Sequence, residues 1–380
     1  MTPPGTAIIT TDEGAPEQGL RHHGDAELAP GLLDLAVNVR GNAPPPWLLS
    51  RLERSLKLLA SYPNPAQATK SIARRHERDV EEVLVTAGAA EAFVLLARAL
   101  QPRRAVCVHP GFTEPEAALR AAGHVVTRVL LEPPYTLDPA QVPADADLVV
   151  VGNPTNPTGV VHARLAELCR PGRVTVVDEA FMDAVPGEPH SLASARLPGL
   201  VVVRSLTKTW ALAGLRVGYL LAEPSVVARL REAQPLWSVS TPALTALDAC
   251  LARGPVKHAE REAAVVADER VFLEQALRDL GVDVSPGSLA PYLLCRVPGR
   301  PDLREALRGQ GVAVRRGDTF PGLTVEHWRT AIRDRQSSER LLEALVQCGL
   351  PRSVPRSVGR SGGRSAREVG PNGGTRGARL

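Results

Sequence analysis

The sequence predicts an α/β protein built around a mostly parallel β-sheet. From Val80 onward, short runs of β-branched residues alternate with stretches that have helical periodicity. This alternation is typical of βαβ units, whose strands lie parallel in one sheet. Several runs lead into glycine, asparagine, aspartate or lysine. Open α/β sheets bind ligands at the carboxyl ends of their strands, so these residues are the first candidates for a site.

The predicted elements of this unit follow one another in a regular order. Seven strands are expected, at 83–86, 105–108, 125–131, 148–151, 174–177, 200–203 and 216–221. Helical patterns cover 88–100, 110–122, 225–233, 242–251 and 255–280. The last pattern is long enough to cross from one domain to another.

A smaller α+β unit is predicted near the carboxyl end. Its strands are expected at 282–284, 292–297, 312–314 and 328–332, and its helices at 302–310 and 337–349. A short apolar run at 32–39 and a helical pattern at 47–59 precede the large unit. We therefore predict a large domain over 61–254 and a small domain over 31–60 and 255–349. The N-terminal arm (1–30) is expected to be flexible at its start, and the Arg/Ser/Gly-rich tail (350–380) disordered.

Charge and composition exclude several classes of function. The net charge is +4, but residues 351–380 contain seven arginines and one glutamate, which leaves −2 on residues 1–350. The body of the protein therefore gives no reason to expect nucleic-acid binding. No apolar run is long enough to span a membrane, and no signal peptide is apparent. The five scattered cysteines have neither disulfide nor metal-ligand spacing, which favours a reducing cytoplasm and no metal.

Lys208 is the first candidate for chemistry. The chain has 45 cationic residues but only four lysines, at 57, 70, 208 and 257. An amine can lose its proton and attack a carbonyl carbon, which a guanidinium cannot do. Ser205, Thr207 and Arg216 are close in sequence and could hold a phosphate. We therefore predict a Schiff-base lysine beside an anchored phosphate, which indicates pyridoxal 5'-phosphate, over the alternative of a surface lysine.

Other strand ends add groups that suit this cofactor. Asp178 follows four β-branched residues and needs a cationic partner, such as a protonated pyridine nitrogen, unless it caps a helix. Ala89 and Ala90 begin a helix directly after a strand, where free N–H groups can bind a phosphate. Phe112 could stack on a heteroaromatic ring or belong to the core.

Two further residues are candidates for ligand binding, one for the cofactor and one for the substrate. The segment Asn-Pro-Thr-Asn-Pro-Thr-Gly at 153–159 has an extended backbone, and its Asn156 could donate to a phenolate-like oxygen or form an Asx turn. Arg329 is a cation on an apolar strand, where its partner would be a substrate carboxylate or an internal acid.

Taken in order, these motifs resemble fold-type I pyridoxal-phosphate enzymes of the class I/II aminotransferase family. The resemblance covers roughly residues 20–349 and rests on the 153–159 segment, on Asp-Glu-Ala-Phe at 178–181, and on Ser-Leu-Thr-Lys at 205–208 with Arg216. It implies a three-layer fold with a seven-stranded sheet and a smaller α+β domain. Within the family, the chain is similar to the histidinol-phosphate aminotransferase group, and inside it most similar to the threonine-phosphate decarboxylases of cobalamin biosynthesis. Phe181 favours this branch, because aminotransferases usually have a tyrosine there.

The resemblance implies a role for each site residue. Lys208 would form the Schiff base, Asp178 would bind the pyridinium nitrogen, Asn156 the ring oxygen, and Phe112 would stack on the ring. Ala89, Ala90, Ser205, Thr207 and Arg216 would hold the phosphate, together with Tyr62 from the other subunit of a homodimer. Arg329 would bind the substrate α-carboxylate. The distal, phosphorylated end of the substrate would lie near Arg315, Asn38, His22 and His23.

The same resemblance leaves the reaction open. The decarboxylases usually show His-Gly-Gly-Asn where this chain has His22-His23-Gly24-Asp25, and the segment after Asn38 also departs from their pattern. The bond held perpendicular to the cofactor ring is the one that breaks, and no motif reports that angle. Decarboxylation of threonine phosphate is the first interpretation. The alternatives are an aminotransferase that uses 2-oxoglutarate and, more remotely, a non-catalytic regulatory domain.

Overall fold

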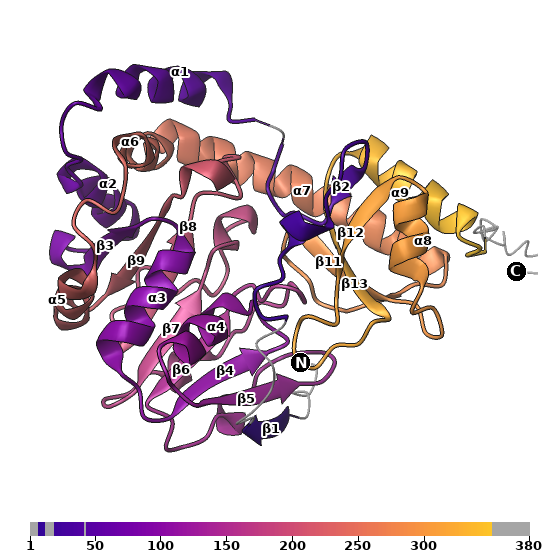
Figure 1. Cartoon of the computed structure of the whole chain (residues 1–380), viewed down its shortest axis with the longest axis horizontal. Helices are drawn as coiled ribbons and strands as arrows, with labels where there is room; N and C mark the ends of the chain where they lie inside the picture. The colour runs from indigo at the N-terminus through magenta and orange to yellow at the C-terminus, as the bar shows by residue number, and fades with distance from the viewer. Residues whose placement is uncertain (1–6, 12–18, 42, 352–380) are drawn as a thin grey trace, which may run out of the picture.

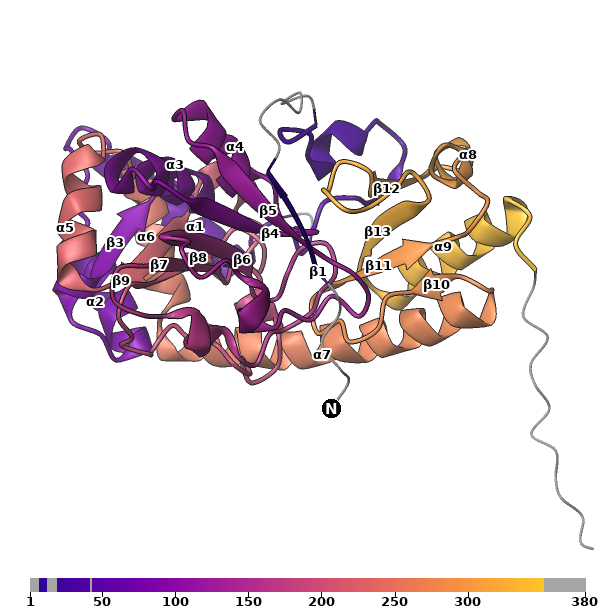
Figure 2. The same cartoon turned by 90° about the horizontal axis from the view of Figure 1, so that it is seen from below.

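The computed structural model describes residues 7–11, 19–41 and 43–351 and shows a large and a small part (Figures 1 and 2). The long helix α7 (Arg253–Asp279) runs along both parts, as the sequence predicts for 255–280. Almost all of the tail predicted at 350–380 lies outside the described residues, as do 1–6 and 12–18 of the predicted arm.

The large part contains an eight-stranded sheet with the order β1-β5-β4-β6-β7-β8-β9-β3. Its five central strands, from β5 to β8, are parallel, and β9 is antiparallel to both of its neighbours. Seven of the strands are the predicted ones: β3 (Val83–Thr86), β4 (Ala105–His109), β5 (Val126–Leu131), β6 (Leu148–Gly152), β7 (Val174–Asp178), β8 (Leu200–Ser205) and β9 (Gly218–Ala222).

The eighth strand corrects the prediction of a flexible start and of seven strands. Strand β1 (Ala7–Thr11) pairs antiparallel with β5 at the edge of the sheet. Four of its five residues are β-branched, and such residues suit an extended strand. The prolines and glycines on either side of this run led to the prediction of a flexible arm instead of a strand.

Helices cover both faces of this sheet and produce three layers (Figure 1). Helices α3 (Ala89–Leu100), α4 (Glu114–Ala121) and α5 (Pro224–Ala233) share one apolar core with the sheet. Helices α2 (Ala66–His76) and α6 (Thr241–Cys250) pack in a second core. Helix α2 was not predicted, because Pro63 and Pro65 were interpreted as the end of a helix, whereas Pro65 is the residue that precedes α2.

Helix α1 (Pro46–Ser55) lies with the large part, although the sequence assigned residues 31–60 to the small domain. Its Leu48 is fully buried in the core that contains α2 and α6. Strand β2 (Leu33–Leu35), in contrast, pairs with a strand of the small sheet. The chain therefore passes from the small to the large part between β2 and α1.

The small part is a five-stranded sheet with the order β10-β11-β13-β12-β2. Its other strands are β10 (Asp283–Val284), β11 (Tyr292–Arg296), β12 (Val312–Arg316) and β13 (His327–Ala331). Helices α8 (Leu303–Gly309) and α9 (Arg335–Gln347) share a separate apolar core with this sheet and with α7. Among the described residues, no helix is both long and apolar enough to cross a membrane.

Candidate active site

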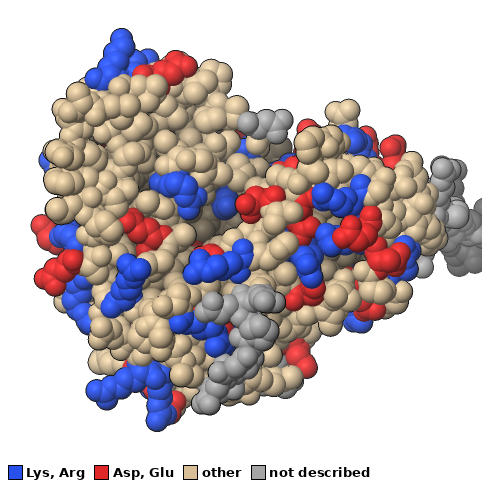
Figure 3. Space-filling view, viewed as in Figure 1, with Lys and Arg blue, Asp and Glu red and all other residues tan. Residues whose placement is uncertain are grey.

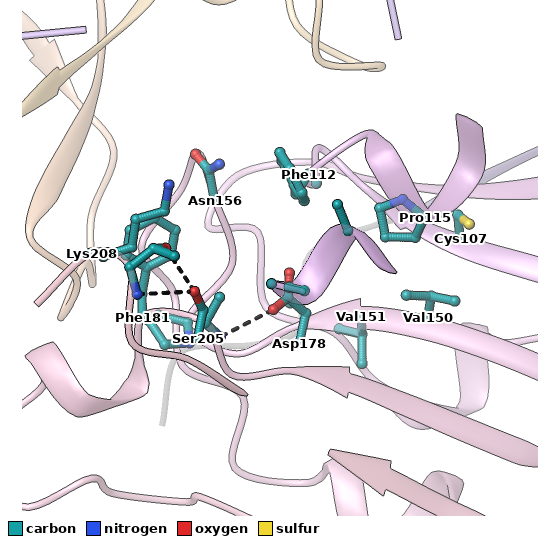
Figure 4. A pocket seen from close by; sticks show the side chains of 18 of the residues that line it. Cys107, Phe112, Pro115, Val150, Val151, Asn156, Asp178, Phe181, Ser205 and Lys208 are labelled. Atoms are coloured by element: carbon teal, nitrogen blue, oxygen red, sulfur yellow. Dashed lines mark hydrogen bonds between the residues drawn. The ribbon is translucent and has the colours of Figure 1, made fainter. Parts of the chain in front are cut away.

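A pocket lies at the carboxyl ends of the central strands, where an open α/β sheet binds its ligands (Figure 4). It encloses about 120 Å³ and opens toward the hollow between the large and small parts that the space-filling view shows (Figure 3). Most of the predicted cofactor residues line it, namely Ala89, Ala90, Phe112, Asn156, Asp178, Ser205, Thr207, Lys208 and Arg216.

Lys208 follows β8 on a loop that hydrogen bonds fix in place. The hydroxyls of Ser205 and Thr207 lie 2.7 Å apart, and the carbonyl oxygen of Lys208 accepts from the N–H of Arg40 at 2.8 Å. Burial, with Arg329 and Arg216 nearby, lowers the pKa of the Lys208 amine to about 8. A substantial fraction of this amine is therefore neutral, and nucleophilic, in the range pH 7–8.

Asp178 ends β7, the strand next to β8 in the sheet. One of its carboxylate oxygens accepts from the N–H of Ala180 at 3.0 Å. Burial raises the pKa of Asp178 to about 6, against the opposing effects of that hydrogen bond and of Lys208. A buried carboxylate with one hydrogen bond is short of cationic partners, and a protonated ring nitrogen would supply one.

Arg216 and the start of α3 form a cradle suited to a phosphate. Gly88 has φ of +79° and directly precedes α3. A Cβ added to Gly88 would lie 2.7 Å from the Arg216 guanidinium, and one added to Gly218 would lie 2.8 Å from the Gly88 carbonyl carbon. The backbone and the arginine therefore approach each other at the free N–H groups of a twelve-residue helix, which is a favourable place for an anion.

Phe112 lies across the pocket from Asp178 (Figure 4). Its ring is half-buried and packs at 5.3 Å, centroid to centroid, against the ring of His23. His23 in turn is 2.6 Å from Glu114 on α4. The pocket between Phe112 and Asp178 has room for a flat ring, which fits the predicted stacking role.

Arg329 connects the small sheet to this pocket. Its guanidinium donates to the Asn156 amide oxygen at 2.5 Å and also to the carbonyl oxygen of Ala36. Burial, with Arg315 nearby, lowers the pKa of Arg329 to about 9. Among the described side chains, no acid forms an ion pair with Arg329, so an internal salt bridge does not explain its burial there.

The structure separates the two candidate histidines. His22 lies 2.9 Å from Glu27, and its carbonyl oxygen accepts from Arg315 at 2.5 Å. His23 instead packs on Phe112, at the cofactor side. Arg315 therefore joins His22 in one cluster, and His23 belongs to another.

Six predicted residues do not line the pocket, namely Arg329, Arg315, His22, His23, Asn38 and Tyr62. Asn38 lines a smaller cavity of about 30 Å³ behind Lys208, and both its side-chain polar atoms are buried without a partner. Tyr62 is 75% exposed and stacks on Trp237 with ring centroids 4.2 Å apart. A role for Tyr62 at the phosphate thus requires a second chain, as the resemblance implied.

The sequence interpretation missed a buried charge cluster beneath the pocket. The Arg204 guanidinium lies 3.0 Å from Glu179 and 2.5 Å from Glu188, and it donates to Ser191 at 2.9 Å. These contacts join the ends of β7 and β8, which carry Asp178 and Lys208. The available signal was Arg204 itself, a cation directly after an apolar run. The sequence interpretation considered such a buried cation only for Arg329.

Comparisons with known proteins give relatives over most of the chain. The family described as aminotransferase class I and II matches residues 31–345. A histidinol-phosphate aminotransferase of Mycobacterium bovis is 51% identical over 332 residues, which cover 86% of this chain and 90% of that protein. A threonine-phosphate decarboxylase of Salmonella typhimurium is 32% identical over 331 residues, which cover 83% and 90%. The solved histidinol-phosphate aminotransferase of Clostridium acetobutylicum has the same fold, with a TM-score of 0.76, 24% identity and coverage of 83% and 99%.

Proposed function

Because the chain belongs to the class I and II aminotransferase family, whose members are pyridoxal-phosphate enzymes, we propose that it transfers the amino group of a small phosphorylated substrate to 2-oxoglutarate. Histidinol phosphate is the proposed amino donor, because the 51% identical relative carries that name. The observation that supports catalysis most directly is Lys208, an amine with a pKa of about 8 that shares one pocket with Asp178.

The residues of the pocket fit the cofactor. When bound, pyridoxal phosphate supplies an aldehyde carbon that an amine attacks and a protonated ring that withdraws electrons. Asp178 would hold the ring nitrogen protonated by its charge, and Phe112 would stack on the ring. The α3 N-terminus and Arg216 bind the phosphate, at the cradle that a Cβ on Gly88 would fill. Lys208 accepts and returns a proton at its Nζ.

The substrate is bound from the small part. Arg329 binds a carboxylate or another anionic group of the substrates, after exchanging its present bond to Asn156 for the ligand. The amide nitrogen of Asn156 takes no part in that bond, and it donates to the ring oxygen. Arg315, beside His22 and stacked over Phe320 at 4.9 Å, meets the distal phosphate.

We propose a homodimer with shared active sites. Tyr62 and Trp237 form a stacked pair on the surface, and Leu236 beside them is 79% exposed. Exposed apolar residues grouped in this way mark protein–protein contacts. In the dimer, Tyr62 of one subunit reaches the phosphate site of the other.

Decarboxylation of threonine phosphate, the first interpretation of the sequence, is the second candidate. Its named relative is 32% identical, against 51% for the histidinol-phosphate aminotransferase, so the relatives favour transamination. Phe181 is the observation that still supports decarboxylation. Its ring lines the pocket 5.8 Å from the Lys208 amine and has no hydroxyl, unlike the tyrosine that the family resemblance implies for aminotransferases.

One experiment separates the two candidates. The purified enzyme, loaded with pyridoxal phosphate, is incubated with histidinol phosphate and 2-oxoglutarate, and separately with L-threonine phosphate. We expect glutamate from the first mixture and no CO2 from the second. CO2 from threonine phosphate without glutamate from the first mixture would contradict the proposal and support the decarboxylase. Lys208→Ala is the control, and it should abolish product in both mixtures.

A further inference from the structure

Three polar side chains form a row across one face of the small sheet. Arg315 on β12 is directly opposite Arg329 on β13, and Arg329 is opposite Leu294 on β11. Tyr292 is two residues before Leu294, so it projects from the same face and is a diagonal neighbour of Arg329. Both arginines of this row belong to the proposed substrate site. Tyr292 has had no role so far.

Tyr292 lies between Arg329 and the wall of the pocket. The Arg329 guanidinium carbon is 5.4 Å from the centroid of the Tyr292 ring. On the other side, the Phe181 ring contacts it edge to face, with centroids 5.1 Å apart and an interplanar angle of 80°. Phe181 itself lines the pocket beside Lys208. One aromatic ring therefore separates Tyr292 from the reactive amine.

The hydroxyl of Tyr292 is buried without a hydrogen-bond partner. The other three tyrosines of the chain are accounted for, because Tyr62 is exposed, Tyr219 bonds to His76 at 2.8 Å, and Tyr135 bonds to Ser285. The Nε atom of Arg329 is also buried and unpartnered, in the same row. Buried polar groups nearly always find partners, so two neighbouring unsatisfied groups beside a pocket indicate a ligand that satisfies them.

The Tyr292 hydroxyl is able to donate a hydrogen bond to such a ligand at neutral pH. Burial raises the pKa of Tyr292 well above its ordinary value, with Asp178 adding to the shift and Arg329 opposing it. The phenol therefore keeps its proton and can donate it to an acceptor on the ligand. Beside a guanidinium, the most favourable acceptor is an anionic oxygen.

We propose that Tyr292 is a ligand-binding residue whose hydroxyl donates a hydrogen bond to an anionic oxygen held between Asn156, Phe181 and Arg329. The inference rests on the proposed function, and that oxygen belongs either to the cofactor ring or to the substrate carboxylate. Phe181 lines this part of the pocket but has no hydroxyl, so Tyr292 supplies the phenol from the layer behind it.

The test compares Tyr292→Phe with Tyr135→Phe, which also removes the hydroxyl of a buried tyrosine, but one that bonds to Ser285 and is not part of the row. Three quantities are measured on enzyme loaded with pyridoxal phosphate: the cofactor's dissociation constant, the pKa of its visible absorption, and the KM for the amino donor. A donor to the cofactor oxygen stabilises the anionic form. Its loss should raise the spectral pKa by about one unit and weaken cofactor binding about tenfold. A donor to the substrate should raise KM by about tenfold to a hundredfold and leave the spectrum unchanged. Tyr135→Phe should change none of the three.

A second variant identifies the acceptor. Phe181→Tyr combined with Tyr292→Phe moves the hydroxyl to the adjacent ring, nearer Lys208. Recovery of the spectral pKa in this double variant assigns the bond to the cofactor oxygen. A KM that stays raised in the double variant, with an unchanged spectrum, assigns the bond to the substrate.

If wild-type enzyme binds pyridoxal phosphate and Tyr292→Phe matches it in all three quantities, the inference is wrong while the proposed function stands. If Tyr292→Phe does not fold, a crystal structure of the liganded wild type decides. A Tyr292 oxygen beyond about 3.5 Å from every ligand oxygen then overturns the inference.

Discussion

At the scale of single residues, burial moves the pKa of the two central groups toward neutrality from opposite sides. Lys208 has its pKa lowered to about 8, and Asp178 has its pKa raised to about 6. Their charges therefore respond to pH within the working range of an enzyme, and each is stabilised by a ligand of the right charge. This coupling leads to two predictions.

The capture of pyridoxal phosphate by cofactor-free enzyme should depend on pH through Lys208. Only the neutral amine attacks an aldehyde, so the rate should rise about tenfold per unit below pH 8 and level off above it. Removing a neighbouring cation raises the pKa of an amine, so Arg329→Leu should move the curve to higher pH by up to about one unit. Stopped-flow absorbance between pH 6 and 9.5 measures both curves. A flat profile would contradict the assignment.

Asp178→Asn should lower turnover about a hundredfold or more. The amide cannot hold the ring nitrogen protonated, and the loss of one partner of a buried charge pair costs about 3–5 kcal/mol. Asp183→Asn is a matched control, because Asp183 is also a buried acid whose pKa burial raises to about 6, but it lines the cavity behind Lys208. Steady-state kinetics of the two variants should differ by at least tenfold. Equal losses of turnover in the two variants would mean that Asp178 affects activity only by stabilising the fold, as any buried acid would.

At the scale of elements, the strand ends decide which residues meet. Asp178 and Lys208 were predicted correctly to meet because each follows a buried parallel strand, and such ends share one edge of the sheet. The sequence could not place Asn38 or separate His22 from His23, because their positions depend on how the 19–41 segment packs against the small sheet. Helix α2 was missed for a local reason. Proline is common both just before and just after a helix, so Pro65 alone does not show whether a helix ends or begins there.

The turn between β3 and α3 carries a third prediction. Gly88→Ala should weaken binding of pyridoxal phosphate about tenfold or more, because its Cβ would push against Arg216 at the phosphate cradle. Gly281→Ala is the control, since Gly281 has nearly the same φ, +78° against +79°, and no atom within 4 Å of the added Cβ. Both variants should lose about 1 kcal/mol of stability from the left-handed backbone. Cofactor titration with thermal melting separates the two effects, and equal cofactor affinity would contradict the cradle.

At the scale of the whole molecule, the proposed homodimer makes each active site depend on a second chain. The pocket contains the residues for the ring and for part of the phosphate site, while Tyr62 lies on the surface beside Trp237. Arg216 is itself exposed in the single chain. A phosphate dianion held partly by exposed groups binds weakly because water screens the charges. A second chain that covers this region would complete the site and exclude water from it.

The exposed aromatic pair therefore provides the test of assembly. Trp237→Asp should give monomers, because it places a charge in the apolar contact and removes the ring on which Tyr62 stacks. Val271→Asp is the control, since Val271 is 59% exposed on α7, compared with 54% for Trp237, and has no stacked partner. Light scattering after size-exclusion chromatography reports the mass, and absorbance of the same peak reports bound cofactor. We expect the Trp237→Asp monomer to lose cofactor as well as its partner, because Tyr62 then reaches no phosphate. A monomer that retains wild-type cofactor affinity would show that each chain holds pyridoxal phosphate alone, and it would rule out the shared site while leaving the chemistry at Lys208 intact.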